Sequence, residues 1–359
     1  MERQSRKLEH LKYSLLLEDG PAAAGFADFH LVHNCLPDLA WEDISISTRV
    51  AGIALPQPVI INAITGGADD VIHVNRDLAE LARQTGAAMA VGSQYAAVEN
   101  PAAMASYKIV RQINPDGVIF ANLGAHATPD AASYAVEMIG AQAIQIHLNA
   151  GQEIIMNEGD RDFSGYLTKV AAIVSKVDVP VIVKEVGCGI AFEQAKALAG
   201  IGVKAIDVGG TGGTNFLAIE AARSLFNLDA DMAGWGIPTA ISAVEVLSMA
   251  GPNLDVVISG GVRTPLDVVK SLALGGMATG IAGPILKNLQ RNGLTAAVQW
   301  YEDFVTDLKR FMLLLGARTI FDLRSSPIVI TGFSREWLQA RGIDTERYAK
   351  RKNRESMVI

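Results

Sequence analysis

The sequence predicts an α/β protein built on a closed (β/α)8 (TIM) barrel, with an N-terminal arm before it and a C-terminal helical extension after it. Three observations support this fold class. From residue 57 onward, short runs of β-branched apolar residues alternate with segments of helical periodicity. Eight such units over ~230 residues match the usual size of this barrel. An open doubly wound sheet usually carries GxGxxG after its first strand, and that motif does not occur there.

The strands are expected where apolar runs are short and are bounded by turn residues. Nearly continuous apolar strands that alternate with helices indicate a parallel sheet covered by helices. The eight expected strands are residues 58–63, 88–92, 117–123, 143–148, 180–185, 205–210, 255–261 and 278–283.

The intervening helices are indicated by apolar residues at helical spacing, and several end in glycine, as helix C-termini often do. We expect residues 1–56 to form a mostly helical and hairpin arm, 57–294 the barrel, and 295–359 a long helix and a tail packed on the barrel. Residues 228–238 are expected to be the longest interior loop. The six expected barrel helices are 75–86, 129–141, 166–177, 191–202, 216–228 and 265–276.

Composition and charge exclude several classes of function. The formal net charge is −7, whereas a nucleic-acid-binding protein needs a basic face. Gly, Pro or charged residues interrupt the apolar stretches, so none reaches the ~20 residues of a membrane span. Two separated cysteines, Cys35 and Cys188, fit a reducing compartment. We therefore expect a cytoplasmic protein that binds no nucleic acid and has no membrane span.

All eight expected strands end in polar residues or glycine. The active site of such a barrel lies at the carboxyl ends of its strands. A single such residue is better explained as a turn former or a helix cap, but eight polar ends together favour a ligand on the barrel axis. The residues at these ends are Thr65, Gly66, Gly67, Ser93, Gln94, Asn122, His147, Asn149, Lys184, Glu185, 211–214, Gly260, Gly261, Ala282 and Gly283.

Two glycine-containing turns late in the barrel predict a phosphate site. Gly260 and Gly261 end the seventh expected strand, and Ala282 and Gly283 end the eighth, each just before a helix start. N–H groups at helix starts bind anions, and the loops after strands seven and eight are the usual phosphate site of this barrel. A further Gly/Thr-rich turn, at 207–216, follows the sixth strand. The alternative is that these glycines only permit tight turns.

Lys184 ends an otherwise apolar strand. A lysine that faces the barrel axis is a fixed positive charge in a site of low dielectric constant. Two functional roles fit it, a Schiff-base lysine or an electrostatic partner of an electron-rich cofactor. The structural alternative is a lysine that reaches toward solvent and pairs with Glu185.

The segment HLNAGQE places His147, Asn149, Gln152 and Glu153 within seven residues at the barrel rim. A lone histidine is more often structural, but this group of polar side chains favours a site. No His or Cys neighbours Glu153 in a zinc-type arrangement. One carboxylate combined with phosphate oxygens and water suits Mg²⁺.

The chain carries NAITGG at 62–67, HLNAGQE at 147–153 and GGTGGTNF at 209–216, with SGGVR at 259–263 and IAGPIL at 281–286. In order, and over nearly its whole length, it resembles the type 2, flavin-dependent isopentenyl-diphosphate delta-isomerases. SGGVR and IAGPIL are shared with other FMN barrels. The remaining matching motifs are RKLEH (6–10), LVHN (31–34), VGSQ (91–94), ANLG (121–124), VKE (183–185) and WGIPTA (235–240).

The resemblance implies an isomerase of isoprenoid biosynthesis that interconverts isopentenyl and dimethylallyl diphosphate. FMN would act in its reduced form, with NADPH as reductant and Mg²⁺ required, and the proton would be transferred at the flavin. Lys184 would stabilise the anionic reduced flavin, while Gln152 and His147 would orient or polarise the reacting groups. A homo-oligomer, a tetramer or an octamer, is implied as well.

The resemblance also implies which residues bind each group. The flavin and its ribityl chain would contact Ala63, Ile64, Thr65, Ser93, Asn122, Lys184 and Thr214. The flavin phosphate would contact Gly260, Gly261, Val262, Arg263, Ala282 and Gly283. The prenyl diphosphate would contact Arg6, Lys7, His10, Ser93, Gln94, Tyr95, Asn149 and Gln152. Glu153 would bind Mg²⁺.

Two departures from the family pattern concern the grip on the substrate. Tyr95 stands where the family usually has an arginine that binds diphosphate, and Asn34 stands where a glutamine is common.

Two other functions stay open. An FMN-dependent oxidoreductase of the 2-hydroxy-acid type would share SGGVR and IAGPIL. It needs a catalytic histidine after the sixth strand, where this chain has VGGTGGT. A non-catalytic flavoprotein that binds prenyl diphosphate is favoured by Tyr95 alone.

Overall fold

The barrel predicted from the sequence is present in the structure, a computed structural model that describes residues 2–251 and 253–351. Eight parallel strands close into a barrel in the order β10-β11-β4-β5-β6-β7-β8-β9. Each lies within one of the predicted runs or overlaps it by all but one residue. The strands are β4 (Val59–Ile61), β5 (Ala88–Ala90), β6 (Ile119–Gly124), β7 (Ala143–Leu148), β8 (Val181–Glu185), β9 (Ala205–Asp207), β10 (Asp255–Ser259) and β11 (Ala278–Ile281).

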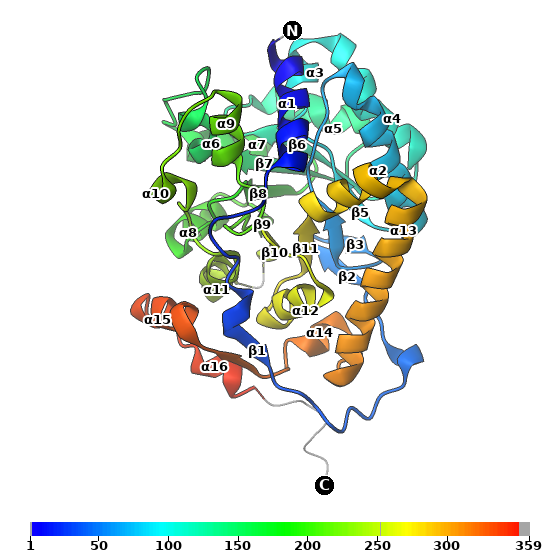
Figure 1. Cartoon of the computed structure of the whole chain (residues 1–359), viewed down its shortest axis with the longest axis vertical. Coiled ribbons are helices and arrows are strands. Elements are labelled where there is room, and N and C mark those ends of the chain that lie inside the picture. The colour runs from blue at the N-terminus through cyan, green and yellow to red at the C-terminus, as the bar shows by residue number, and fades with distance from the viewer. Residues whose placement is uncertain (1, 252, 352–359) are drawn as a thin grey trace.

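Helices surround the barrel on its outer side (Figure 1). In chain order the main ones are α2 (Ile72–Thr85), α4 (Ala105–Ile113), α5 (Pro129–Ile139), α7 (Tyr166–Lys176), α8 (Phe192–Gly200), α11 (Thr239–Met249), α12 (Pro265–Leu274) and α13 (Gly283–Leu314). Shorter helices lie between strands and helices at the strand ends, namely α3 (Tyr95–Glu99), α6 (Ala150–Ile155), α9 (Phe216–Arg223) and α10 (Ala230–Ala233).

Two barrel helices, α4 and α11, were not among those predicted. In α11 the residues from Thr239 to Val246 are all buried, so the helix lacks the polar face that gives a helical period. The predicted helix at 216–228 is present as the shorter α9. It does not lead directly into the next strand, because α10 and α11 follow it before β10.

The inside of the barrel is apolar at one end and polar at the other. Apolar side chains such as Ile60, Ala88, Phe120 and Ile182 form the apolar end. The hairpin of β2 (Thr48–Val50) and β3 (Ile53–Leu55) packs onto this cluster through its buried apolar residues. Only the carboxyl ends of the strands therefore remain open for a ligand.

The arm and the tail meet on the side of the barrel. Helix α1 (Glu2–Leu16) packs against α9 and α13 at the top of Figure 1. Strand β1 (Phe29–Leu31) pairs antiparallel with β12 (Ile328–Ile330). The rest of the tail forms α14 (Ile320–Leu323), α15 (Gly332–Ala340) and α16 (Glu346–Ala349).

The division of the chain at residues 56 and 294 stays a prediction. Gly293, with φ 79°, interrupts α13 one residue before the second boundary. The pairing of β1 with β12, however, joins the arm to the tail. Among the described residues, no helix has both the length and the apolar character that crossing a bilayer would require.

Candidate active site

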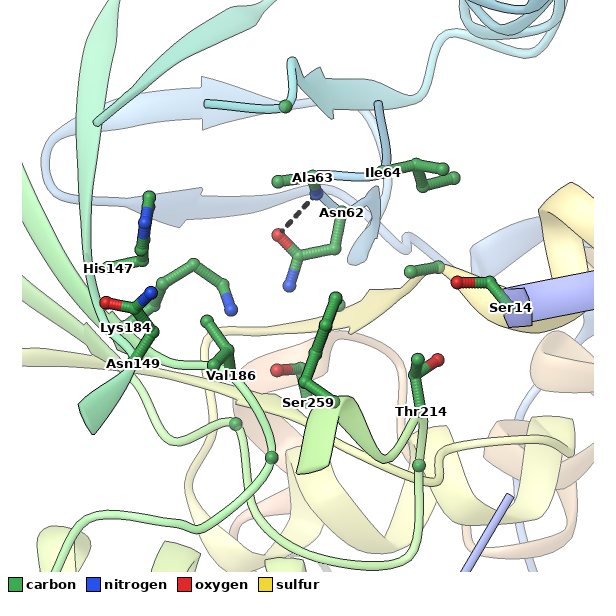
Figure 2. Close-up of a pocket in the computed structure, with 18 of the residues that line it drawn as sticks. Ser14, Asn62, Ala63, Ile64, His147, Asn149, Lys184, Val186, Thr214 and Ser259 are labelled. Carbon is green, nitrogen blue, oxygen red and sulfur yellow. Dashed lines mark hydrogen bonds between the residues drawn. The ribbon is translucent and has the colours of Figure 1, made fainter. Parts of the chain in front are cut away.

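A pocket lies at the carboxyl ends of the barrel strands, and every one of the eight strands or its following turn contributes to its wall (Figure 2). The side chains of Asn62 and Lys184 extend into the same space, with Ser259 and Thr214 on the opposite side. Helix α1 supplies the outer wall through Lys7, His10, Leu11 and Ser14.

Nearly all of the predicted site residues line this pocket. Their assigned roles stay predictions, because a position in the wall does not show what a side chain binds. The predicted residues found in the wall are Lys7, His10, Ala63, Ile64, Thr65, Ser93, Tyr95, Asn122, His147, Asn149, Gln152, Glu153, Lys184, Thr214, Gly260, Gly261, Val262, Arg263, Ala282 and Gly283.

Gln94 is the exception, and we remove it from the expected substrate contacts. Its side chain is fully buried. Nε2 donates to the backbone oxygen of Ala135 at 2.8 Å, and Oε1 accepts from the backbone N–H of Asn122 at 3.0 Å. Gln94 therefore joins strand β6 to helix α5 from behind the wall. The side chain of Arg6 lies outside the described residues.

Lys184 lines the pocket. The structural alternative was an ion pair with Glu185, but the carboxylate of Glu185 is bound by backbone N–H groups instead. Oε2 of Glu185 accepts the N–H groups of Val186, Gly187 and Cys188 at 2.7, 2.7 and 2.5 Å. Burial nevertheless raises the pKa of Glu185, although these hydrogen bonds and the charge of Lys184 oppose the shift. Nζ of Lys184 donates to the backbone oxygen of Glu185 at 2.6 Å, which leaves further N–H donors for a ligand.

His147 is a neutral base at ordinary pH. Burial is the largest cause, and the charges of Lys184, Lys7 and His126 add to it, so the pKa of His147 falls to about 3. Nδ1 lies 2.9 Å from Oδ1 of Asn122.

Three buried polar residues at the floor of the pocket, of which Asn62 also lines its wall, were not singled out from the sequence. Asn62, Gln145 and Asp207 hydrogen-bond to one another and, through Asn122, to His147. Each is at most 6% exposed. A signal was present, because each interrupts an apolar strand run (VIINA, AIQI, AIDV) with a group that needs a partner.

Glu220 on α9 is a further residue that the sequence analysis missed. Its Oε1 accepts from Gln152 Nε2 at 2.6 Å and lies 2.7 Å from His10 Nε2, while Oε2 accepts from Arg223 Nε at 2.8 Å. Burial alone would raise the pKa of Glu220, but the hydrogen bonds from His10, Gln152 and Arg223 and the charge of His10 outweigh it and lower the pKa to about 2. Helical spacing from Phe216 could have placed Glu220 on the pocket side of α9.

Tyr95 contacts a histidine that the sequence analysis did not select. The rings of Tyr95 and His126 meet edge to face, with centroids 4.7 Å apart and planes at 64°. Both residues line the pocket. An aromatic and imidazole pair therefore occupies the position where an arginine was expected.

Arg263 holds the arm as well as lining the pocket. Its guanidinium donates to Oδ2 of Asp19 at 2.5 Å and to the backbone oxygen of Gly212 at 2.7 Å. Both contacts use Nη2, so a phosphate could take the further N–H donors at Nε and Nη1.

The wall offers a flavin an unused donor. The hydroxyl of Thr65 is buried and has no hydrogen-bond partner among the described residues, so a bound group would satisfy it. Helix α13 begins at Gly283 in the wall, and helix starts suit phosphate. The turn alternative also has support at Gly260, because its φ is 101° and a Cβ there would lie 2.2 Å from the backbone oxygen of Gly210.

The metal site would have a single protein carboxylate. No group of three or more His, Cys, Asp or Glu side chains that could hold a metal is found within residues 2–251 and 253–351. Oε1 of Glu153 accepts from Asn149 at 2.8 Å, and Oε2 accepts from the N–H of Asp160 at 3.0 Å. Each oxygen keeps a lone pair for Mg²⁺, and the remaining ligands would come from phosphate and water.

The fold and the pocket define a (β/α)8 barrel with a ligand site at the carboxyl ends of its strands, and the family model that matches the chain is FMN-dependent. Residues 121–330 match the family described as FMN-dependent dehydrogenase. A lactate oxidase of Pediococcus acidilactici has a TM-score of 0.67 at 18% identity and covers 90% of this chain and 87% of its own. A mandelate oxidase variant has a TM-score of 0.64 at 17% identity, with 92% and 99% covered. At this identity the likeness shows the fold alone.

Curated relatives specify the family more narrowly. The isopentenyl-diphosphate delta-isomerase of Symbiobacterium thermophilum is 47% identical over 98% of this chain and 99% of its own. Those of a Geobacillus strain and of Staphylococcus haemolyticus are 47% and 44% identical, over 98% and 96% of this chain and 100% and 99% of theirs. The chain belongs to the isopentenyl-diphosphate delta-isomerase family, type 2.

Proposed function

We propose that the protein catalyses the reversible isomerisation of isopentenyl diphosphate to dimethylallyl diphosphate at reduced FMN. The proposal rests on the family to which the chain belongs and on one observation of the structure. Lys184, His147 and Gln152 come from three different elements, and together they face the one pocket that all eight strand ends form.

When bound and reduced, FMN supplies a group that exchanges a proton with the alkene carbons. Lys184 places a positive charge in a largely buried site, where it stabilises negative charge on the ring system. Thr65 offers its hydroxyl to the cofactor, and the start of α13 offers backbone N–H groups to the phosphate.

Gln152 and His10 are oriented by the same carboxylate. Because Nε2 of Gln152 donates to Glu220, the amide oxygen of Gln152 is left to accept from a group in the pocket. His10 shares Glu220 through its Nε2. His10 and Lys7 on the outer wall bring nitrogen groups that can donate to the diphosphate.

Mg²⁺ would be held by Glu153 and by the diphosphate oxygens, and NADPH would reduce the flavin. We place the enzyme in the cytoplasm, in isoprenoid biosynthesis, and as a homo-oligomer of four or eight chains. These five statements rest on the family resemblance.

Turnover under anaerobic conditions with NADPH-reduced FMN and Mg²⁺ tests the proposal. Isopentenyl diphosphate should convert to an equilibrium mixture with dimethylallyl diphosphate. In a separate anaerobic sample without NADPH, oxidised flavin that lactate or mandelate bleaches would indicate the 2-hydroxy-acid oxidoreductase, although the turn after β9 carries Gly209, Gly210 and Thr211 and no histidine. Binding of prenyl diphosphate without conversion would indicate the non-catalytic flavoprotein.

A further inference from the structure

A continuous chain of side-chain hydrogen bonds crosses the barrel at the floor of the pocket and ends at His147. Nδ2 of Asn62 lies 2.7 Å from Asp207 Oδ2, and Nε2 of Gln145 lies 3.0 Å from Asn62 Oδ1. Nδ2 of Asn122 lies 3.0 Å from Gln145 Oε1, and Asn122 Oδ1 lies 2.9 Å from His147 Nδ1. We call this chain, from Asp207 to His147, the amide relay.

The orientation of Asn62 is fixed by two independent partners. The backbone N–H of Ala63 donates to Oδ1 of Asn62 at 3.0 Å, the contact dashed in Figure 2. A backbone N–H can only donate, so it requires the oxygen of the amide on its side. On the other side the carboxylate of Asp207, which also accepts from Ser259 Oγ at 2.5 Å, requires the NH2 group.

This orientation is transmitted along the relay. Since Oδ1 of Asn62 accepts, Gln145 must present its NH2 group to it and its oxygen to Asn122. Asn122 must then present its NH2 group to Gln145 and its oxygen to His147. A carbonyl oxygen only accepts, so Nδ1 of His147 must carry a proton.

We propose that the amide relay holds His147 in the tautomer protonated at Nδ1, so that Nε2 offers the pocket a hydrogen-bond acceptor. Asn62, Gln145 and Asp207 are positioning residues that act through Asn122. The ring is neutral at ordinary pH, as its lowered pKa indicates, so it does not carry a second proton on Nε2.

The chemical class of the partner follows. A bare Nε2 pairs with an N–H or O–H donor, such as a ring N–H of the flavin or an ordered water, and repels an anionic diphosphate oxygen. The tautomer itself follows from the geometry alone. Its part in isomerisation, as an acceptor that orients a donor near the reacting carbons, rests on the proposed function.

Long-range ¹H–¹⁵N NMR of the holoenzyme with ¹⁵N-labelled histidine measures the tautomer directly. The chain has six histidines, and the signals of His147 are those that His147→Asn removes. We expect Nδ1 to be protonated and Nε2 to be bare in the unmutated protein. The reverse pattern would overturn the proposal whatever the enzyme turns over.

Gln145→Met interrupts the relay with a side chain of similar size. Asn122 is then free to turn its NH2 group toward Nδ1, so the ratio of the two tautomers should shift about tenfold toward the Nε2–H form, the equivalent of one hydrogen bond. Ser259→Ala is the matched control, because it removes a hydrogen bond to Asp207 outside the relay and should leave the tautomer unchanged.

Gln145→Glu supplies the conservative rescue. A carboxyl group at this position accepts from Nδ2 of Asn122 whether or not it is protonated, so His147 should keep its Nδ1 proton. An unchanged tautomer in Gln145→Met, or a lost one in Gln145→Glu, would contradict the relay. If Gln145→Met does not fold, the spectra of the unmutated protein and of Gln145→Glu still decide the question.

Discussion

The positive charge of Lys184 is the single-residue feature of the pocket on which the proposed chemistry depends most. Lys184→Met removes the positive charge that Glu185 leaves available. We expect weaker retention of FMN, a lower flavin reduction potential, and isomerisation slower by ~10²–10³. Lys204→Met is the control, because Lys204 lies exposed just before β9, at the opposite end of the barrel. Full activity and an unchanged potential in Lys184→Met would show that this lysine does not act on the flavin.

Glu153 carries the proposed metal site at the same scale. Glu153→Gln should raise the Mg²⁺ concentration needed for half-maximal activity and leave the bound flavin in place. The exposed Glu302→Gln on α13 provides a matched change of charge. Identical Mg²⁺ titrations for the two variants would remove Glu153 from the metal site.

Tyr95 offers the diphosphate one neutral hydroxyl, at the position where the sequence comparison led us to expect the guanidinium of an arginine. A charged hydrogen bond to diphosphate contributes ~1.5–3 kcal/mol, which corresponds to roughly ten- to hundredfold in affinity. We expect Tyr95→Arg to lower KM for isopentenyl diphosphate and to leave kcat near its starting value, measured with reduced FMN at saturating Mg²⁺. His126 packs on Tyr95, so Tyr95→Phe serves as the control that keeps the ring contact. A KM that stays constant or rises in Tyr95→Arg would place the diphosphate elsewhere.

The lowered pKa of Glu220 should make the stability of the fold depend on pH in the acid range. Its pKa lies at about 2 in the folded protein, against an ordinary value of 4.5. A carboxylate with a lowered pKa stabilises the fold above its unfolded pKa, and this contribution is lost as the pH falls from 4.5 toward 2. Glu220→Gln should therefore cost up to about 3 kcal/mol in urea unfolding at pH 7 and much less near pH 2.5. An equal cost at both pH values would mean that packing, and not charge, accounts for it.

At the scale of elements, the turn after β4 depends on glycine. Gly66 has φ 153°, and a Cβ there would lie 2.2 Å from Cε1 of Tyr107. Tyr107 is fully buried, and its hydroxyl donates to the backbone oxygen of Ser93 at 2.5 Å, so it has little room to move. Gly66→Ala should lower the free energy of unfolding by about 3 kcal/mol.

Gly200→Ala is the matched control for this turn. Gly200 ends α8, and a methyl group added to its Cα would have no neighbouring atom within 4 Å. Alanine there should therefore be neutral or stabilising by up to about 1 kcal/mol. Equal unfolding midpoints for the two alanine variants would contradict the role given to Gly66.

The sequence predicted the elements well where periodicity was visible and poorly where burial removed it. Eight apolar runs separated by turns were enough to place the strands of the barrel. Helix α11 was missed because it is buried almost all round. Helix α4 has a clear apolar face, so its periodicity could have been recognised in the sequence.

The candidate site was predictable for a related reason. Polar residues at strand ends are visible in the sequence, and twenty of the predicted positions line the pocket. The partners of these residues were not visible, because a hydrogen bond such as Gln152 to Glu220 joins positions 68 residues apart. Gln94 also follows a strand, and we therefore predicted that it would contact the substrate. Its side chain points into the protein instead.

At the scale of the whole molecule, the arm is fastened to the barrel around the pocket. Asn215 donates to the backbone oxygen of Gly20 at 2.8 Å, and Arg263 binds Asp19. The backbone N–H of Ala240 donates to the oxygen of Ala24 at 2.9 Å. These contacts keep α1, with Lys7 and His10, over the strand ends, so the outer wall of the pocket depends on residues far from the barrel in sequence.

Proton transfer without net redox change is the activity proposed for this pocket. The most direct measurement is isomerisation in D2O under anaerobic conditions, with reduced FMN and isopentenyl diphosphate in large excess. We expect dimethylallyl diphosphate that carries solvent deuterium, formed over many turnovers while the absorbance of the reduced flavin stays constant. Product without solvent deuterium, or a flavin oxidised in step with product, would contradict it.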